Sequence, residues 1–251
     1  MPAGSAVARQ RLCWDWPVSE EPIAEPVVSA RGIRMTGPWG PVYGPIDLDV
    51  DEGGVTVLVC PAGTGRTALL MTLAGRMRPV AGDLRVFGRA KAKDIFGLAA
   101  LAGIDELDTV AESVTVQNLI TEQLRWDAAW YRLIRRASAD DLSRVCTPVF
   151  GEHPLPPLSE YVEELGELDG LLLRIALANT GRPPLLVVGD LDQVTSDHNR
   201  DILLNRLIEL GRRQTVITAT VNGVDNDGVR AQIEVHNVTR AELVSEQKGA
   251  H

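Results

Sequence analysis

One short stretch of the chain carries the residues best suited to bind a phosphate: Cys60-Pro61-Ala62-Gly63-Thr64-Gly65-Arg66-Thr67-Ala68. It follows a continuously apolar run, 55–59, and leads into a segment where leucines recur at helical spacing, at Leu69, Leu70 and Leu73. A strand, a glycine-containing turn and a helix in this order direct backbone N–H groups and a helix N-terminus at one place. The stretch is therefore predicted to hold a polyphosphate, although an ordinary strand, turn and helix would show the same order.

The stretch keeps two of the four fixed positions of the phosphate-binding pattern G-x-x-x-x-G-K-[ST]. Gly65 and Thr67 match the pattern, whereas Cys60 stands at the first glycine and Arg66 at the lysine. Arginine keeps the positive charge beside the β- and γ-phosphates, but its planar fork on a longer arm is not equivalent to a compact ammonium. Nucleotide binding should therefore survive this change better than catalysis.

Eight apolar segments are predicted to be strands. The segment 46–50 alternates apolar and acidic residues, which is typical of a half-exposed antiparallel strand, whereas 55–60 and 185–189 are largely apolar, as in the centre of a parallel sheet. The other predicted strands are 27–35, 84–87, 97–102, 216–219 and 231–235. Because helical segments alternate with them, the sequence indicates an α/β fold with an antiparallel early part and a parallel later part.

A helical block is predicted from about 113 to 144. Apolar residues recur there at spacings near three, four and seven, at Leu119, Leu124, Trp126, Trp130 and Leu133. The same block has a local basic face formed by Arg132, Arg135 and Arg136. A proline-rich break at 153–157 separates it from a second predicted helix, 169–179.

The composition argues against several classes of protein. The 251 residues include 34 acidic and 25 basic side chains, and the net charge of -9 argues against a nucleic-acid footprint and a polybasic membrane-surface patch. The three cysteines lie far apart and indicate neither a disulfide framework nor a zinc site. No apolar run approaches the roughly 18 residues that span a bilayer. We expect a soluble protein of the cytoplasm that reaches a membrane only through a partner.

The segment after the phosphate loop completes a resemblance to a known family. With that loop, Leu69-Leu70-Met71-Thr72-Leu73-Ala74-Gly75-Arg76-Met77-Arg78-Pro79-Val80-Ala81-Gly82-Asp83-Leu84-Arg85-Val86-Phe87-Gly88 resembles the nucleotide-binding subunit of an ATP-binding cassette (ABC) transporter. The resemblance implies an α/β P-loop NTPase of ABC type, with an antiparallel β-subdomain and an inserted helical subdomain. The cassette is expected at 27–240 and its helical subdomain at about 107–170. Residues 1–26 are expected to form an extension and 241–251 a polar tail.

The resemblance also assigns roles to residues that follow the predicted strand at 185–189. Gly189 occupies the position of the Walker B aspartate that helps to hold Mg²⁺, and glycine offers no oxygen ligand. Asp190 stands where the family has its catalytic glutamate, so it is the predicted catalytic residue and, with Thr67, the predicted metal ligand. The implied cofactors are ATP, bound by the nine residues of the phosphate loop, and Mg²⁺. Asp192 is a further carboxylate close to these positions, and capping of a helix or contact with solvent is an equally open role for it.

Three further family motifs are altered. Leu168-Asp169-Gly170-Leu171 stands in for the signature motif, and Asp169 is expected to serve there as a helix N-cap. Asp105 and Glu106 lie where the family has its Q-loop glutamine; they could contact Mg²⁺, but a solvated role is the simpler interpretation. Val221 takes the place of the switch histidine and cannot hydrogen-bond a γ-phosphate through its side chain.

An aromatic residue before the phosphate loop often stacks on adenine in this family. Trp39 and Tyr43 are the candidates, in a segment rich in turn residues, and a packing role is at least equally open to them. The four histidines, His153, His198, His236 and His251, do not fall at the switch position and are interpreted as surface or structural residues.

The leading hypothesis is an ATP-binding subunit of an ABC-type membrane transporter whose hydrolysis is weak or depends on a partner cassette. Such a subunit would lie at the inner face of the cell membrane, bound to an integral membrane permease subunit and paired with a second cassette as a homodimer or heterodimer, without binding nucleic acid. The alternative is a non-enzymatic interaction or regulatory protein that keeps the fold but no longer uses nucleotide. A soluble P-loop kinase or GTPase fits less well, because the helical insertion matches the order of a cassette.

Overall fold

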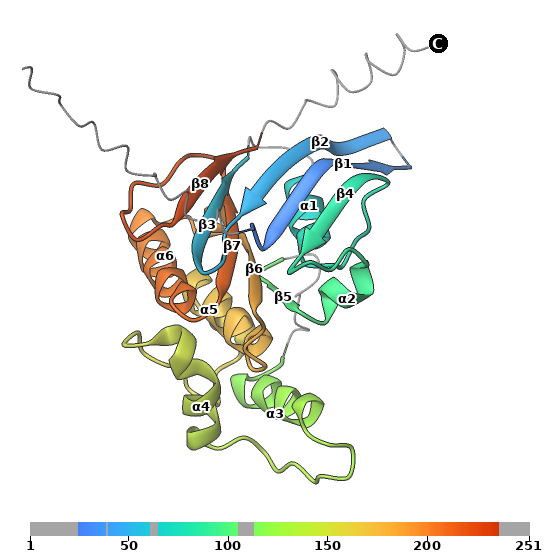
Figure 1. The fold of residues 1–251 in the computed structure, drawn as a ribbon. Coiled ribbons are helices and arrows are strands. Elements are labelled where there is room, and N and C mark those ends of the chain that lie inside the picture. Colours follow the sequence, from blue (N-terminus) through green and yellow to red (C-terminus); the bar gives the residue numbers. More distant parts are fainter. Residues whose placement is uncertain (1–24, 39, 61–64, 105–112, 236–251) are drawn as a thin grey trace, which may run out of the picture.

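The structure is a computed structural model that describes residues 25–38, 40–60, 65–104 and 113–235, and it contains two sheets above a group of helices (Figure 1). The antiparallel sheet has the strand order β2-β1-β4, with β1 at Val28–Gly37, β2 at Gly40–Val50 and β4 at Ala81–Val86. The parallel sheet has the order β5-β6-β7-β3-β8. Its strands are β3 (Gly54–Val59), β5 (Ala99–Ala102), β6 (Leu185–Asp190), β7 (Thr215–Thr220) and β8 (Ala231–Glu234). Each predicted strand is confirmed.

Short helices connect these strands. The α-helices are α1 (Arg66–Leu73), α2 (Ala92–Phe96), α3 (Val116–Asp127), α4 (Ala139–Phe150), α5 (Glu167–Ala178) and α6 (Asp197–Gly211). Two 3-10 turns are η1 (Val162–Glu164) and η2 (Leu191–Gln193). The helices predicted after the phosphate loop and at 169–179 are therefore present, as α1 and α5. None of the helices in the described part of the chain is long and apolar enough to span a bilayer.

The central strands β3 and β6 of the parallel sheet are buried on both faces, which explains their largely apolar sequences. On β6, Leu185 and Val187 belong to a core shared with α1 and the antiparallel sheet. Their neighbours Leu186 and Val188 belong to a second core shared with α3, α4, α5 and α6. Alternate side chains of one strand thus pack into two different cores. The buried sheet therefore holds in place the residues that follow the carboxyl ends of its strands.

Strand β2 is longer than the predicted 46–50, since it begins at Gly40 and pairs with β1 as far as Gly37. Tyr43 lies in this added part; its side chain is fully buried and its hydroxyl donates to Thr72 Oγ1 at 2.7 Å. Tyr43 is therefore a packing residue, and its stacking on adenine was the wrong alternative. Trp39 lies outside the described residues.

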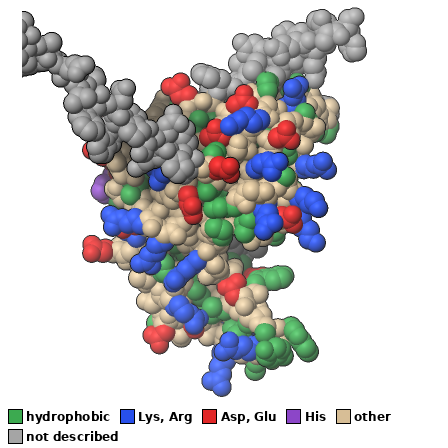
Figure 2. Space-filling model, in the orientation of Figure 1, with side chains coloured by type: hydrophobic (Ala, Val, Ile, Leu, Met, Phe, Trp, Pro, Cys, Tyr) green, Lys and Arg blue, Asp and Glu red, His purple; other side chains and the backbone are tan. Residues whose placement is uncertain are grey.

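The prediction of a helical block through 113–144 is wrong in its middle. Helix α3 ends at Asp127, the next residues form an irregular loop, and α4 begins only at Ala139. Local bonds favour this second start, because the Ser138 hydroxyl accepts from Asp141 N–H while the Asp141 carboxylate accepts from Ser138 N–H, a capping box. Figure 2 shows the resulting end of the molecule, at the bottom of the view, with hydrophobic and basic side chains at its surface.

Candidate functional site

The candidate site lies where α1 begins, beside the carboxyl ends of β6 and β7. A cavity of ≈ 150 Å³ opens there, lined by Arg66, Thr67, Leu70, Gly103, Ile104, Asp190 and Gln193. The order of strands brings these residues together, because β3, which leads to α1, pairs in parallel with β7, and β7 pairs with β6. Pro61, Ala62, Gly63 and Thr64 of the predicted phosphate loop lie outside the described residues.

Arg66 is held by two carboxylates at this cavity. Its Nη2 pairs with Asp190 Oδ2, and its Nη1 lies 3.3 Å from Asp192 Oδ2. The Arg66 side chain is only 17% exposed and that of Asp190 16%. Low exposure limits screening by water, so this pairing is stronger than one at the surface. The sequence singled out Arg66 and Asp190, and the structure places them in direct contact.

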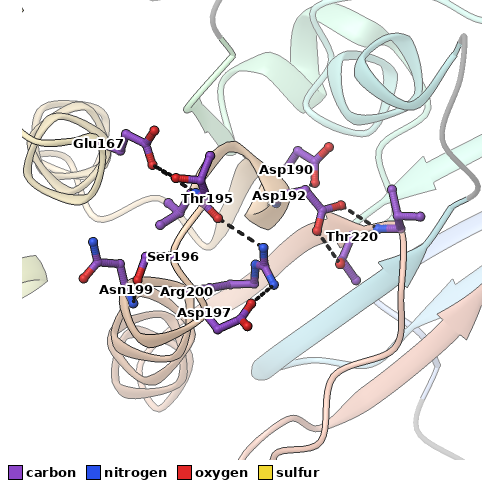
Figure 3. A network of polar contacts seen from close by, with 11 residues as sticks. Glu167, Asp190, Asp192, Thr195, Ser196, Asp197, Asn199, Arg200 and Thr220 are labelled. Atoms are coloured by element: carbon purple, nitrogen blue, oxygen red, sulfur yellow. Dashed lines mark hydrogen bonds and ion pairs between the residues drawn. The ribbon is translucent and has the colours of Figure 1, made fainter.

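Asp192 joins the cavity to the end of β7, so of the two open roles the contacts favour that of a further carboxylate beside the cavity. Its carboxylate accepts from Val221 N–H at 2.7 Å and from the Thr220 hydroxyl at 3.2 Å (Figure 3). The same carboxylate also pairs with Arg66. Asp190 is the residue that caps locally, since it accepts from Asp192 N–H at 2.9 Å. The spacing of two carboxylates, two residues apart behind a buried strand, was the signal for this cluster.

Gly189 has no room for a side chain. A Cβ atom there would overlap the carbonyl oxygen of Gly103, on the neighbouring segment after β5. The Gln193 side chain holds this carbonyl by donating from Nε2 at 2.7 Å, while its own Oε1 is buried without a partner among the described residues. The backbone packing therefore leaves no space for a side chain at position 189, where the resemblance to ABC cassettes predicts an altered Walker B position. Gln193 lines the cavity, and the sequence analysis missed it because it belongs to no motif.

The described residues do not fit Mg²⁺ in this arrangement. Gly189 offers no side-chain ligand, and both nearby carboxylates, Asp190 and Asp192, are paired with Arg66. Among the described residues, no cluster of three or more His, Cys, Asp or Glu residues is suited to a metal ion. Thr67 and Asp190 both line the cavity, so metal binding by these two residues stays a prediction that requires Arg66 to leave Asp190. Asp105 and Glu106 lie outside the described residues.

Cys60, at the end of β3, is a structural residue in this environment. Its side chain is buried, and burial raises the pKa of the thiol to about 11, against an opposing effect of the Arg66 charge. Its N–H donates to Thr220 O at 2.9 Å, which continues the pairing of β3 with β7. A protonated, buried thiol is a poor nucleophile. The role of Cys60 is therefore to hold the backbone in place at the start of the predicted phosphate loop.

The region that replaces the signature motif is tied to the loop after β6. Helix α5 begins at Glu167 with Gly166 as its N-cap, so the expected N-cap role of Asp169 is wrong. Asp169 lies in the first turn instead, and its carboxylate is 2.7 Å from His153 Nε2. Glu167 accepts from both Thr195 N–H and the Thr195 hydroxyl at 2.9 Å, and the backbone bond, the larger cause, lowers the pKa of Glu167 (Figure 3).

Comparison with known proteins gives the same kind of protein from sequence and from structure. No family model matches the chain. It is 28% identical over 113 residues to the cytochrome c biogenesis ATP-binding export protein CcmA of Pseudomonas putida GB-1, covering 42% of this chain and 54% of that protein. It is 32% identical over 104 residues to CcmA of Cupriavidus pinatubonensis, covering 41% and 44%. The chain thus spans about half the length of the curated relatives it matches.

The structural similarity is broader. A putative ABC transporter ATP-binding protein from Pyrococcus furiosus superposes with a TM-score of 0.63 at 16% identity, covering 83% of this chain and 97% of that one. At this level of identity the likeness establishes the fold. The chain therefore shares the overall fold of ABC ATPase cassettes.

Proposed function

Because the chain has the fold of an ABC-type nucleotide-binding subunit and resembles such subunits in sequence, we propose that it binds ATP at the cavity around Arg66. One observation carries the proposal: the largely covered guanidinium at the first turn of α1, 17% exposed, lies at a cavity that Thr67 also lines. A partly buried cation at a helix N-terminus is suited to a polyphosphate. The nine residues from Cys60 to Ala68 form the proposed nucleotide loop.

ATP binding requires an exchange of partners at Arg66. In the structure described, Asp190 and Asp192 hold the guanidinium. Phosphate oxygens accept from the same planar fork, so they compete directly with the two carboxylates. The two carboxylates set the affinity for nucleotide as well as the position of the arginine, and ATP binding releases Asp190 for another role.

Hydrolysis is proposed to be weak or to depend on a partner cassette. Asp190 is the proposed general base, but it becomes available only when Arg66 moves away. Val221, at the position of the switch histidine, contributes a backbone N–H that is already bonded to Asp192. Phosphoryl transfer depends on positioned charges, and the described residues supply fewer of them than the family pattern contains.

The partners are proposals that follow from the relatives. A cassette that resembles ATP-binding export proteins is proposed to bind an integral membrane permease subunit and a second cassette, as a homodimer or a heterodimer. It would then lie at the cytoplasmic face of the cell membrane. No nucleic-acid role is proposed.

Calorimetric titration of the full chain with ATP, with and without Mg²⁺, tests this proposal, together with phosphate release from the same sample. We expect saturable binding with slow release, and Arg66→Ala should weaken binding at least about tenfold, since a bond to a charged group contributes roughly 1.5–3 kcal/mol. Arg212→Ala is the matched control, because Arg212 follows the end of α6, is 71% exposed and does not line the cavity. An unchanged affinity in Arg66→Ala would remove Arg66 from the site.

Asp190→Asn separates the exchange of partners from simple charge loss. Removing a competing carboxylate should tighten ATP binding several-fold while it lowers phosphate release, whereas a merely structural role would lower both. Arg66→Lys should raise hydrolysis only slightly, because Gly189 and Val221 remain. Absence of ATP binding at millimolar concentration would favour the second candidate, a non-enzymatic interaction protein, which the full pairing of Arg66 with carboxylates also fits.

A further inference from the structure

The irregular loop between α3 and α4, residues 128–137, is here called the tip loop. Four of the seven exposed large hydrophobic side chains of the described residues lie on it or just before it: Trp126, Trp130, Tyr131 and Leu133. Trp130 is 95% exposed and Leu133 93%. Such a concentration within eight residues exceeds the scattered exposure that is normal for a soluble surface, and it marks an interaction site.

The C-terminal end of the tip loop is anchored to α3, so its exposed side chains do not belong to an unattached segment. Ala137 is buried, and its N–H donates to the Thr121 hydroxyl at 2.9 Å. Its carbonyl accepts from Gln117 Nε2 at 2.8 Å. Both partners lie on α3, and the Ser138 capping box then starts α4. The aromatic rings are therefore held out from the helices, with Trp130 and Tyr131 edge to face at 5.9 Å.

The same segment is basic within an acidic chain. Exposed arginines occur at Arg125, Arg132, Arg135 and Arg136, and none of them has an ion pair among the described residues. Residues 125–137 contain these four arginines and one acid, Asp127, which gives a local charge of 4 minus 1, or +3, against -9 for the whole chain. The overall charge therefore hides a local cationic surface.

A groove runs beside the tip loop, with a volume of ≈ 590 Å³. Apolar side chains of α3, α4 and the tip loop line part of it, among them Leu124, Leu133 and Val149. The charged residues of the lining are five arginines and two aspartates, so positive charge prevails: Arg132, Arg135, Arg136, Arg144, Arg182, Asp127 and Asp141. A lining that is both apolar and cationic suits an amphiphile with an anionic head group. Phosphate oxygens pair with guanidinium groups, while glycerol and the first acyl carbons contact the apolar part.

We propose that the tip loop and its groove rest on an anionic phospholipid membrane, with the aromatic side chains in the interfacial region and the arginines on lipid phosphates. Tryptophan and tyrosine concentrate at that level of a bilayer, and basic residues beside them are drawn to anionic lipid. A nucleic acid fits less well, because the rest of the chain is acidic. The proposal does not depend on ATP binding. It differs from the expectation, drawn from net charge, that the protein reaches a membrane only through a partner, and the experiment below decides between the two.

Sedimentation of the full chain with phospholipid vesicles tests the proposal. The two vesicle samples are phosphatidylcholine alone and phosphatidylcholine with about 30 mol % phosphatidylglycerol, in about 0.1 M salt, where surface charges still act over roughly 10 Å. We expect at least about tenfold tighter binding to the anionic vesicles, weakened by added salt. A blue shift of tryptophan fluorescence that Trp130→Phe removes would place the tip loop at the lipid.

Two variants and a matched control decide which residues carry the binding. Arg132→Gln/Arg135→Gln/Arg136→Gln and Trp130→Ala/Tyr131→Ala should each weaken binding at least about tenfold, because charge and interfacial partitioning both contribute. Val80→Ala/Arg85→Gln removes an exposed apolar and an exposed basic residue elsewhere and should bind as wild type does. All these side chains are exposed, so unfolding curves should coincide with that of the wild type.

Two results of the vesicle experiment would overturn the proposal. If the wild type sediments equally with neutral and anionic vesicles, or if the two tip-loop variants bind as the control does, the loop does not bind lipid. The tip loop would instead be a protein-binding surface if two results were found together. The wild type would not bind vesicles, and a purified permease would bind the wild type but not the tip-loop variants. Neither result would change the outcome of the ATP titration.

Discussion

Arginines at the two ends of the molecule are in opposite states. Arg66 is half-buried and paired with Asp190 and Asp192, whereas Arg135 and Arg136 on the tip loop are exposed and have no acidic partner among the described residues. A ligand of Arg66 must displace carboxylates, but a ligand of the tip loop displaces only water and small ions. The affinity of the first site is therefore controlled by competition within the protein, and that of the second by salt concentration.

The cavity and the tip loop also differ in how closely their residues are packed. Around Gly189, the Gly103 carbonyl leaves no space for a Cβ atom, and Gln193 holds that carbonyl in place. Around Trp130 and Leu133, side chains stand in solvent. Substitutions at the cavity should therefore change stability, whereas substitutions at the tip loop should change only binding.

The largest effect is expected for Gly189→Ala. The added methyl group would overlap the Gly103 carbonyl, which is backbone and cannot rotate away, so the segment after β5 must move. Overpacking of this kind costs about 1–3 kcal/mol or more. We expect a loss of about 3 kcal/mol in the free energy of unfolding, measured in urea.

Gly170→Ala on α5 is the matched control, because nothing lies within 4 Å of its added Cβ. Alanine is the better helix former, so this variant should gain roughly 0.5–1 kcal/mol. A Gly189→Ala protein as stable as the wild type would contradict the view that the cavity end is closely packed, and would mean that an aspartate could be restored there.

Asp192→Ala should have the second-largest effect. It removes the acceptor of Val221 N–H and of the Thr220 hydroxyl and leaves Arg66 with one carboxylate. Hydrogen bonds to charged groups contribute roughly 1.5–3 kcal/mol, so a loss of about 2 kcal/mol in unfolding free energy is expected. In Asp197→Ala, the control, a 92% exposed carboxylate is removed from a surface pair, with an expected loss under about 1 kcal/mol. Equal losses in the two variants would refute a supporting role for Asp192.

The fold was predictable where local pattern and burial agree. The alternation of 46–50 and the continuous apolar runs at 55–60 and 185–189 identify strands because each face of a sheet has a fixed environment. The helical prediction failed at 128–137 for a corresponding reason. Trp130 and Leu133 continue the helical spacing, but their chain segment is held by Thr121 and Gln117 through Ala137, contacts between residues far apart in the sequence.

The candidate site was predictable only in part. Arg66 and Asp190 were found because each occupies a motif position. Their pairing, and the addition of Asp192, depend on the register in which β6, β7 and β3 lie side by side, which joins residues more than a hundred positions apart. The crowding at Gly189 depends on the course of the chain after β5. Neither can be read from a local sequence pattern.

The smallest effect is expected at the helical end, for Ser138→Ala. The Ser138 hydroxyl accepts from Asp141 N–H at 3.3 Å and donates to the Asp141 carboxylate at 2.8 Å, so the variant loses half of the capping box of α4. Loss of an N-cap costs about 1 kcal/mol. The tip loop ends at this cap, and its position on α3 is kept by Ala137, so vesicle binding should change little while the free energy of unfolding falls.

The loss of stability in Ser138→Ala should depend on pH. Hydrogen bonds from Ser138, first from its backbone N–H and then from its hydroxyl, lower the pKa of the Asp141 carboxyl in the folded protein. A lowered folded-state pKa gives stability that is fully present above the ordinary value of about 4 and is lost as the pH falls through the lower one. The difference between wild type and Ser138→Ala should therefore be constant from about pH 5 to 8 and shrink below about pH 4. Urea unfolding at a series of pH values measures it, with Asp141→Asn expected to remove the acid-dependent part. If the difference in unfolding free energy between wild type and Ser138→Ala stayed the same in acid, Ser138 would stabilise α4 without help from the Asp141 carboxylate. The charges near the tip loop would then affect ligand binding and not stability.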